Sequence, residues 1–237
     1  MRLRPLMQMA FWFACLLVGG EVIAQRAEPI QGKAAVELKF DKQQYYLGEL
    51  CTVEFVLKNT DEKDIAYSAG GDYRGSGRAL RFRVQAVDAD GAVVPEADPV
   101  MCMGGLSGIG TLQPGKEWRQ TLRSLDYLKL TKPGKYTIRI THDLGWKDPQ
   151  APIGETQVEF LMPDQRQAEK ILGAISAELK RADPERNWQG WKVPSLKDLA
   201  LPVYLPLLKK RALAGGGGNR FFFMRWARFQ PRRSRWR

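Results

Sequence analysis

Apolar and polar side chains alternate along several short runs between residues 34 and 162. In the first run, Val36, Leu38 and Phe40 are separated by charged residues. A period of two residues is typical of a β-strand that buries one face. The same alternation predicts further strands at residues 51–58, 65–67, 80–86 and 92–94, around Trp118, and at 134–140 and 157–161.

Turn-forming residues separate these runs. Asp88-Ala89-Asp90-Gly91 predicts a hairpin turn, and Pro-Gly pairs at 114–115 and 133–134 precede further strands. Tyr136 stands where sandwich domains carry a tyrosine corner, whose hydroxyl bonds to the backbone upstream. About seven short strands with intervening turns predict a mainly β fold, an immunoglobulin-like antiparallel β-sandwich over residues 34–162.

Two glycine-rich stretches, residues 70–77 and Pro99–Gly110, are predicted to be loops. The second contains Met101, Cys102 and Met103. One interpretation is a mobile binding loop, because methionine side chains adapt to varied partners. The other is a structural loop that Cys102 tethers to the sandwich. No Gly-Lys-Ser/Thr sequence follows the glycines, so the stretch gives no support to nucleotide binding.

The apolar period changes to about 3.6 residues after Pro163, which predicts a helix. Asp164 is its expected N-cap, and the helix should end near Ala182. Leucines between residues 201 and 208 indicate a second helical stretch, so residues 163–214 form a short helical segment after the sandwich. The apolar stripe of the first helix consists of Ala168, Ile171, Leu172, Ile175 and Leu179.

Three motifs carry a resemblance to known proteins: Leu112-x-Pro-Gly-Lys, Leu130-x-x-Pro-Gly-Lys-Tyr-Thr-Ile-Arg and Thr141-His142-Asp143-Leu144-Gly145-Trp146. They resemble Ig-like domains of secreted bacterial proteins, of the kind that precede HEAT-type helical repeats. A more distant likeness is to the BsuPI-type proteinase-inhibitor sandwich. The resemblance implies a sandwich over residues 34–162 and the start of a HEAT-type array over 163–214. No second helical repeat follows in the sequence, and no residue matches a reactive-loop motif of the inhibitor family.

The N-terminal 24 residues have the pattern of a secretory signal peptide. Arg2 and Arg4 precede an uncharged apolar stretch from Leu6 to Gly20, and Val22-Ile23-Ala24 fits a cleavage site. The apolar stretch is shorter than the roughly 20 residues that span a bilayer, although an uncleaved anchor is an alternative. The expected location is therefore secreted or periplasmic.

Export changes the meaning of the cysteines. Cys15 would leave with the signal peptide, so Cys51 and Cys102 would remain as a pair. In an oxidising compartment such a pair predicts a disulfide. The alternative is two unrelated thiols, with Cys51 on a buried strand position.

The net charge of +11 is concentrated at the C-terminal end. Residues 220–237 hold seven arginines and no acidic residue; without them and the +1 of residues 1–25, the body carries +3. This excludes a strong electrostatic attraction to nucleic acid. Residues 215–237, four glycines and a basic aromatic tail, are expected to be disordered. Arg220–Arg237 are compatible with weak contact to an anionic membrane, or with out-of-frame translation of a G-rich coding run.

Candidate chemistry is sparse. One histidine and three cysteines exclude multi-histidine and four-thiolate metal sites, and no nucleophile elbow or cofactor motif is present. We therefore expect no catalytic residue, cofactor or metal. The sequence predicts a non-catalytic protein-interaction or adhesion module that binds a protein or cell-surface partner. The alternative is a proteinase inhibitor or an accessory domain of an extracytoplasmic enzyme. His142, Asp143 and Trp146 form the expected interaction patch.

Overall fold

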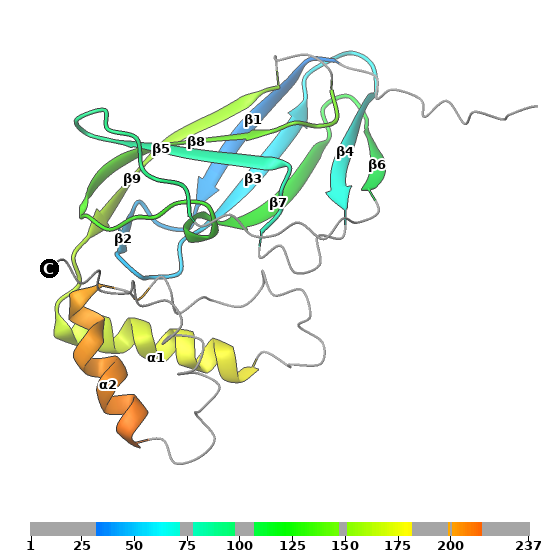
Figure 1. Ribbon diagram of the computed structural model, residues 1–237. Helices are drawn as coiled ribbons and strands as arrows, with labels where there is room; N and C mark the ends of the chain where they lie inside the picture. Colours follow the sequence, from blue (N-terminus) through cyan, green and yellow to red (C-terminus); the bar gives the residue numbers. More distant parts are fainter. Residues whose placement is uncertain are drawn as a thin grey trace, which may run out of the picture.

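The computed structural model describes residues 32–71, 78–97, 107–146, 151–181, 199 and 201–214. Its sheets form a sandwich, and two helices lie at one end of it (Figure 1). The elements are β1 (Ala34–Phe40), β2 (Gln44–Tyr46), β3 (Thr52–Asn59), β4 (Ile65–Gly71), β5 (Phe82–Asp88), β6 (Ser107–Leu112), β7 (Glu117–Arg123), the 3-10 helix η1 (Ser124–Asp126), β8 (Gly134–His142), β9 (Ile153–Leu161), α1 (Gln165–Arg181), the 3-10 helix η4 (Pro202–Tyr204) and α2 (Leu205–Ala214).

The mainly β fold predicted from the alternating pattern is confirmed. One sheet has the order β1-β3-β7, and the other has the order β2-β9-β8-β5. A two-stranded sheet, β4-β6, stands beside them. Every pairing is antiparallel except β2 with β9. The short β2 was not predicted from the sequence, because Gln44, Tyr45 and Tyr46 show no clear alternation.

The core lies between the two larger sheets. Val53, Phe55 and Leu57 of β3 are fully buried, and so are Ile138 and Ile140 of β8. These are the inward positions that a period of two residues predicts, and each buried side chain of this size stabilises the fold by about 1.5–3 kcal/mol.

The sheets also approach closely where β9 crosses β1. A Cβ atom at Gly154 would lie 2.5 Å from Cγ1 of Val36 and 2.7 Å from Cγ of Leu38. Only glycine fits this approach.

The tyrosine corner is confirmed. The hydroxyl of Tyr136 donates a hydrogen bond to the backbone carbonyl of Lys132 at 2.7 Å, while its ring is buried. The bond fixes the turn at Gly134, whose φ of 152° an L-residue rarely adopts. The expected turn at Asp88–Gly91 is also present, with the Asp88 carboxylate accepting bonds from the backbone N–H groups of Asp90 and Ala92.

Both glycine-rich loop predictions need correction where the structure describes them. Residues 70 and 71 end β4, and residues 107–112 form β6, which pairs with β4. A Cβ atom at Gly110 would lie 2.7 Å from Cζ of Tyr67, so this glycine makes room for an aromatic ring. Residues 72–77 and 98–106, including Cys102, lie outside the described residues.

The predicted first helix and its N-cap are confirmed. The Asp164 carboxylate accepts a hydrogen bond from the backbone N–H of Gln167 at 2.7 Å, and the Gln167 side chain accepts one from the N–H of Asp164. This reciprocal capping box satisfies two backbone donors that a helix start leaves open. The buried stripe of α1 comprises Ala168, Ile171, Leu172 and Ile175.

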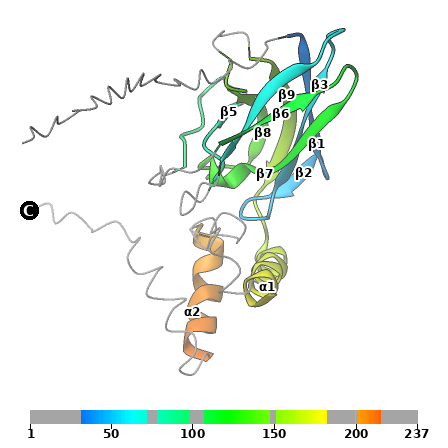
Figure 2. The ribbon, with the colours of Figure 1, turned by 90° about the vertical axis from the view of Figure 1, so that its right-hand side faces the viewer.

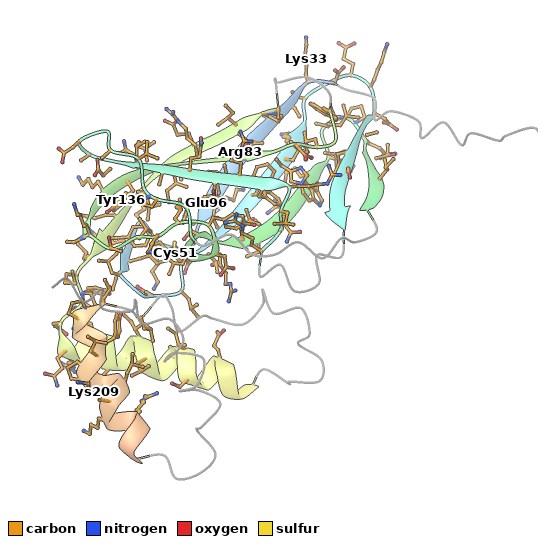
Figure 3. All side chains as sticks on the ribbon, viewed as in Figure 1. Lys33, Cys51, Arg83, Glu96, Tyr136 and Lys209 are labelled. Carbon is orange, nitrogen blue, oxygen red and sulfur yellow. The ribbon has the colours of Figure 1, made fainter. Side chains whose placement is uncertain are left out.

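The helical segment is anchored to the sandwich through Tyr204. Its ring is fully buried, and its hydroxyl donates to the carbonyl of Leu47 at 2.6 Å. Gly48 lies beneath the ring with a φ of 88°, and a Cβ there would be 2.7 Å from the hydroxyl. Both views show α1 and α2 at the same end of the sandwich (Figure 2). Lys33 and Lys209 consequently lie at opposite ends of the molecule (Figure 3). Within the described ranges, no helix is long and apolar enough to cross a membrane.

Candidate binding cavity

The structure places the predicted patch at the end of β8, but its histidine is enclosed. His142 is 1% exposed, and its ring centroid lies 4.5 Å from that of Phe82 and 5.2 Å from that of Trp118. Nδ1 accepts a hydrogen bond from the backbone N–H of Leu144 at 3.0 Å. The neutral ring therefore carries its proton on Nε2, which has no hydrogen-bond partner within the described part of the chain.

Burial is the main cause that lowers the pKa of His142 to about 4. The Asp143 carboxylate opposes this shift, and the Arg81 guanidinium adds to it. The side chain is therefore neutral at pH 7, because the charged form would lose its hydration between the sheets.

Asp143 and Trp146 stabilise the turn that follows β8 and attach this turn to β4. The Asp143 carboxylate pairs with Arg81 at 2.6 Å and accepts the backbone N–H of Gly145 at 3.0 Å. The indole N–H of Trp146 donates to the carbonyl of Ala66 in β4 at 2.8 Å. Only Asp143, which is exposed, and the half-buried Trp146 present surface to a partner, so contact through this patch stays a prediction for those two residues.

A cavity of about 190 Å³ lies at the C-terminal end of β7, on a different part of the sandwich. Pockets for drug-sized ligands occupy about 300–1,000 Å³, so this cavity fits an amino-acid side chain or a chain end instead. It is lined by Arg78, Ala79, Gln120, Thr121, Leu122, Arg123, Asp126 and Tyr127.

An ion pair forms one wall of the cavity. Nε of Arg123 donates to the Asp126 carboxylate at 2.8 Å and Nη2 donates at 3.0 Å, while the two side chains are only 16% and 11% exposed. The third guanidinium nitrogen, Nη1, is buried and has no hydrogen-bond partner that the described structure supplies. Arginine stays charged at any physiological pH, so this donor cannot be removed by deprotonation.

A second arginine, Arg78, also lines the cavity. The guanidinium of Arg78 stands 5.2 Å from the centre of the Tyr127 ring and pairs with Glu96. The Tyr127 hydroxyl donates to the carbonyl of Ala79 at 2.9 Å and accepts its N–H at 3.1 Å. Burial raises the pKa of Tyr127, so the phenol stays protonated and keeps this wall in place.

The cavity residues were not predicted from the sequence. The sequence contains one local indication of the cavity. Arg123 and Asp126 are three residues apart at the end of a strand, where a short helix brings their side chains together. Arg78 comes from a segment about 45 residues earlier, and only the fold places it nearby. Within the ranges that the structure covers, no group of three or more His, Cys, Asp or Glu side chains could hold a metal ion.

Cys51 is the described member of the predicted disulfide. It is 1% exposed, and burial is the first cause that raises the pKa of its thiol to about 12. Its carbonyl accepts the backbone N–H of Ser124, next to the cavity residue Arg123, at 3.0 Å. Because Cys102 lies outside the described residues, the pairing stays a prediction.

The fold defines the chain as a β-sandwich with a helical extension. No protein-family model matches the sequence, and no curated protein matches it. Among solved structures, the chain is similar to the CARDB domain of a Pyrococcus furiosus protein, with 15% identity over 57% of this chain and 96% of that chain and a TM-score of 0.31. Two further similarities are to a β-glucosidase from Erythrobacter marinus (15% of that chain, 54% of this chain, 16% identity, TM-score 0.31) and to the sporulation control protein Spo0M from Bacillus subtilis (56% of that chain, 62% of this chain, 17% identity, TM-score 0.30). At TM-scores this low, the alignments assign no function.

Proposed function

We propose that this chain is an exported, non-catalytic β-sandwich that binds another protein at the cavity beside β7. The observation that carries the proposal is the cavity itself: it has the size of one side chain, and Arg123 in its lining has a buried guanidinium nitrogen without a partner among the described residues. A small pocket that takes one anchoring side chain is the usual centre of a protein interface. The cavity is too small for a nucleotide or another large cofactor.

The chemistry of the candidate residues supports a non-catalytic role. A general base works best when its pKa lies near the working pH and its nitrogen reaches the substrate. The single histidine of the chain is enclosed between the sheets, and its pKa is about 4. The Cys51 thiol is also buried, with a pKa of about 12, which disfavours the reactive thiolate.

Photo-crosslinking from the cavity tests the interaction. A photoreactive phenylalanine analogue at Gln120 lines the cavity, and the same residue at Lys135, exposed on β8, is the matched control. We expect one protein to crosslink from position 120 alone and, once purified, to bind the wild-type chain at least tenfold more tightly than Arg123→Lys. Equal crosslinking from both positions, or none from position 120, contradicts the proposal.

Export is part of the proposal and has its own support in the sequence. The charged start, the apolar stretch and Ala24 before Gln25 match a cleaved signal peptide. Mass spectrometry of the chain from fractionated cells should find Gln25 as the first residue in the extracytoplasmic fraction. An intact Met1 in the cytosolic fraction would refute export.

Export also gives the disulfide prediction its test. A bond between Cys51 and Cys102 would close a loop of about 50 residues, which stabilises the fold by about 4 kcal/mol in the chain-entropy model. Non-reducing mass spectrometry of the exported chain should find the linked peptides, and Cys102→Ser should lower the melting temperature. Two free thiols in that material contradict the prediction.

The alternative function, a proteinase inhibitor or an enzyme accessory domain, predicts a different result. The resemblance that supports an inhibitor points to the fold, and residues 99–106, the methionine-containing part of the segment before β6, are the loop chosen to test it. A panel of proteases separates the two functions. Stoichiometric inhibition that is lost when residues 99–106 are replaced would favour the inhibitor, whereas the interaction module inhibits none of them.

A further inference from the structure

The cavity lies at the end of β7, whose outer edge pairs with no described strand. In the order β1-β3-β7, β7 pairs with β3 on one side only. No described residue forms a backbone hydrogen bond with the other side. In the side view, β7 lies beside β3 and above the helices (Figure 2).

The register shows which backbone groups face outward. Ser124 N–H donates to the carbonyl of Cys51, and Asn59 N–H donates to the carbonyl of Lys116, so odd residues of β3 exchange bonds with even residues of β7. In an antiparallel pair, the intervening residues turn their N–H and C=O groups to the other side. The four outward residues of β7 are therefore Glu117, Arg119, Thr121 and Arg123.

Among the described residues, none forms a backbone hydrogen bond with the outward groups of β7. Thr121 and Arg119 are exposed, and the Thr121 carbonyl has one long contact at 3.2 Å, from the side-chain amide of its neighbour Gln120. The charged side chain of Arg119 lies on the face of the sheet, where it pairs with Glu54 at 2.9 Å and Glu117 at 2.7 Å. These ion pairs hold the Arg119 side chain on the face of the sheet and not over the backbone edge, although charged residues on an edge strand often protect it from pairing.

The cavity continues this edge and selects a negative group. Thr121 and Arg123 belong both to the free edge and to the cavity lining. Arg123 and Arg78 both line the cavity, and each is paired with a carboxylate, Asp126 and Glu96, so the preference for a negative group rests on the donor that Arg123 has left over and not on net charge. Nη1 of Arg123 has no hydrogen-bond partner in the described structure, so an acceptor that draws the guanidinium toward the cavity gains a charge-assisted hydrogen bond.

From this placement we infer that an extended polypeptide adds to the outer edge of β7 as a further strand and seats a carboxylate in the cavity beside Arg123. The inference deepens the proposed function, on which it rests, by naming the form and the anchoring group of the partner. Main-chain hydrogen bonds supply affinity in such strand addition, and the pocket for one side chain supplies specificity. The carboxylate belongs either to an Asp or Glu side chain or to the C-terminus of the added chain.

Hydrogen exchange of the free protein tests, without a ligand, whether the outward amides of β7 lack hydrogen-bond partners. The amide protons of Arg119 and Thr121 should exchange quickly, whereas those of Trp118, Gln120 and Leu122, which bond to β3, should be protected. On binding, the outward amides should become protected and the inward ones should not change. Protected amides at 119 and 121 in the free protein would show that the edge is already covered, and would overturn the inference.

The ligand is sought with displayed libraries of short random peptides. One library ends in a free carboxyl group, and the other is displayed with both ends blocked. Selection from the first library alone identifies a C-terminal carboxylate, and selection of Asp or Glu from the second identifies a side chain. Replacing the selected carboxylate by its amide should weaken binding about tenfold or more. Selected peptides without a required carboxylate overturn the inference.

Three variants locate the contact on the protein. Thr121→Pro removes the outward N–H of an edge position but keeps the bonds to β3, and it should abolish peptide binding. Thr121→Val keeps the N–H and should bind normally. Arg123→Lys keeps the charge but loses the guanidinium nitrogen, and it should weaken carboxylate peptides at least tenfold while leaving their amide versions unchanged. Circular dichroism confirms that each variant is folded.

The outcomes separate the inference from the proposed function. Peptides that bind Thr121→Pro as well as wild type overturn strand addition. If a protein still crosslinks from position 120, the interaction function stands with another binding mode. Failure of both the peptide selection and the crosslinking removes the inference and the proposed function together.

Discussion

Two buried nitrogen atoms lack a hydrogen-bond partner among the described residues, and they stand in opposite surroundings. Nε2 of His142 lies between the sheets, among the rings of Phe55, Phe82 and Trp118. Nη1 belongs to Arg123, a residue that lines a surface cavity. A buried donor without a partner costs about 1–3 kcal/mol, so each needs a physical account.

The surroundings of His142 serve the stability of the fold and not binding. Its ring can become neutral, and the lowered pKa shows that burial has this effect. One nitrogen accepts a backbone N–H, which holds Leu144 at its positive φ of 50°, and the other faces aromatic rings. No polar ligand has a route to this nitrogen, because the side chain is 1% exposed.

The arginine region keeps its charge and remains open at the surface. Asp126 neutralises the guanidinium but occupies only two of its three nitrogens. A buried ion pair contributes little to stability when hydrophobic residues of equal size can replace it. The comparison teaches that an unsatisfied donor points to binding only where it is charged and lines a cavity.

The largest expected effect on stability comes from disrupting the buried aromatic cluster around His142. Phe55 is fully buried and contacts Phe82, Trp118 and His142. Phe55→Ala should lower the free energy of unfolding by about 3–5 kcal/mol, through lost burial and the cavity left behind. Urea unfolding measures this loss. Peptide binding at the Arg123 cavity should persist wherever the variant is folded, and its loss would show that the two regions are coupled.

Acid should destabilise the protein through His142, the next largest effect. Its ordinary pKa is 6.5, and the folded state lowers it to about 4. Above pH 6.5 both states hold a neutral ring and stability is complete. As the pH falls from 6.5 to 4, the unfolded chain takes up the proton first, so the free energy of unfolding decreases by about 3 kcal/mol in total.

His142→Phe is the matched control for this pH dependence. It fills the aromatic space without a titrating group, and its stability should stay nearly flat between pH 6.5 and 5, where few carboxylates titrate. Urea unfolding at several pH values measures both proteins. An identical slope for the two would show that other groups cause the acid sensitivity.

The sequence predicts the parts of this fold that depend on local pattern. The inward positions of β3, the Tyr136 corner and the Asp164 cap each follow from residue types at fixed spacings, and each is present. β6 was missed because Gly108 and Gly110 have no side chains to alternate, and the close ring of Tyr67 that requires Gly110 comes from a distant strand.

The candidate site was less predictable for a similar reason. His142 and Trp146 stand out in the sequence because their residue types are rare, but rarity does not show whether a side chain points into the core. Arg123 is one of many arginines. Its importance depends on Arg78 and on the free edge of β7, which are properties of tertiary structure.

A smaller effect is expected from the cavity wall. Tyr127→Phe removes the hydroxyl that donates to and accepts from Ala79. Both backbone groups of Ala79 would lose this partner, so the free energy of unfolding should fall by about 1–2 kcal/mol. The lost bonds also hold Ala79 and its neighbour Arg78 in the cavity lining. Affinity for carboxylate peptides should therefore fall as well. Tyr136→Phe, which removes a tyrosine hydroxyl-to-backbone bond away from the cavity, is the control: it should lower stability by a similar amount and leave affinity unchanged.

The smallest effect on stability is expected from the residues that matter most for binding. Arg123→Met combined with Asp126→Leu replaces the ion pair by apolar side chains and removes both of its charges. The free energy of unfolding should change by less than about 1 kcal/mol, because the desolvation of the pair offsets its attraction. Carboxylate peptides should no longer bind, since the guanidinium is gone. Calorimetry and peptide titration on the same preparation measure the two quantities. A large loss of stability would mean that the pair is structural, like His142, and the contrast between the two regions would disappear.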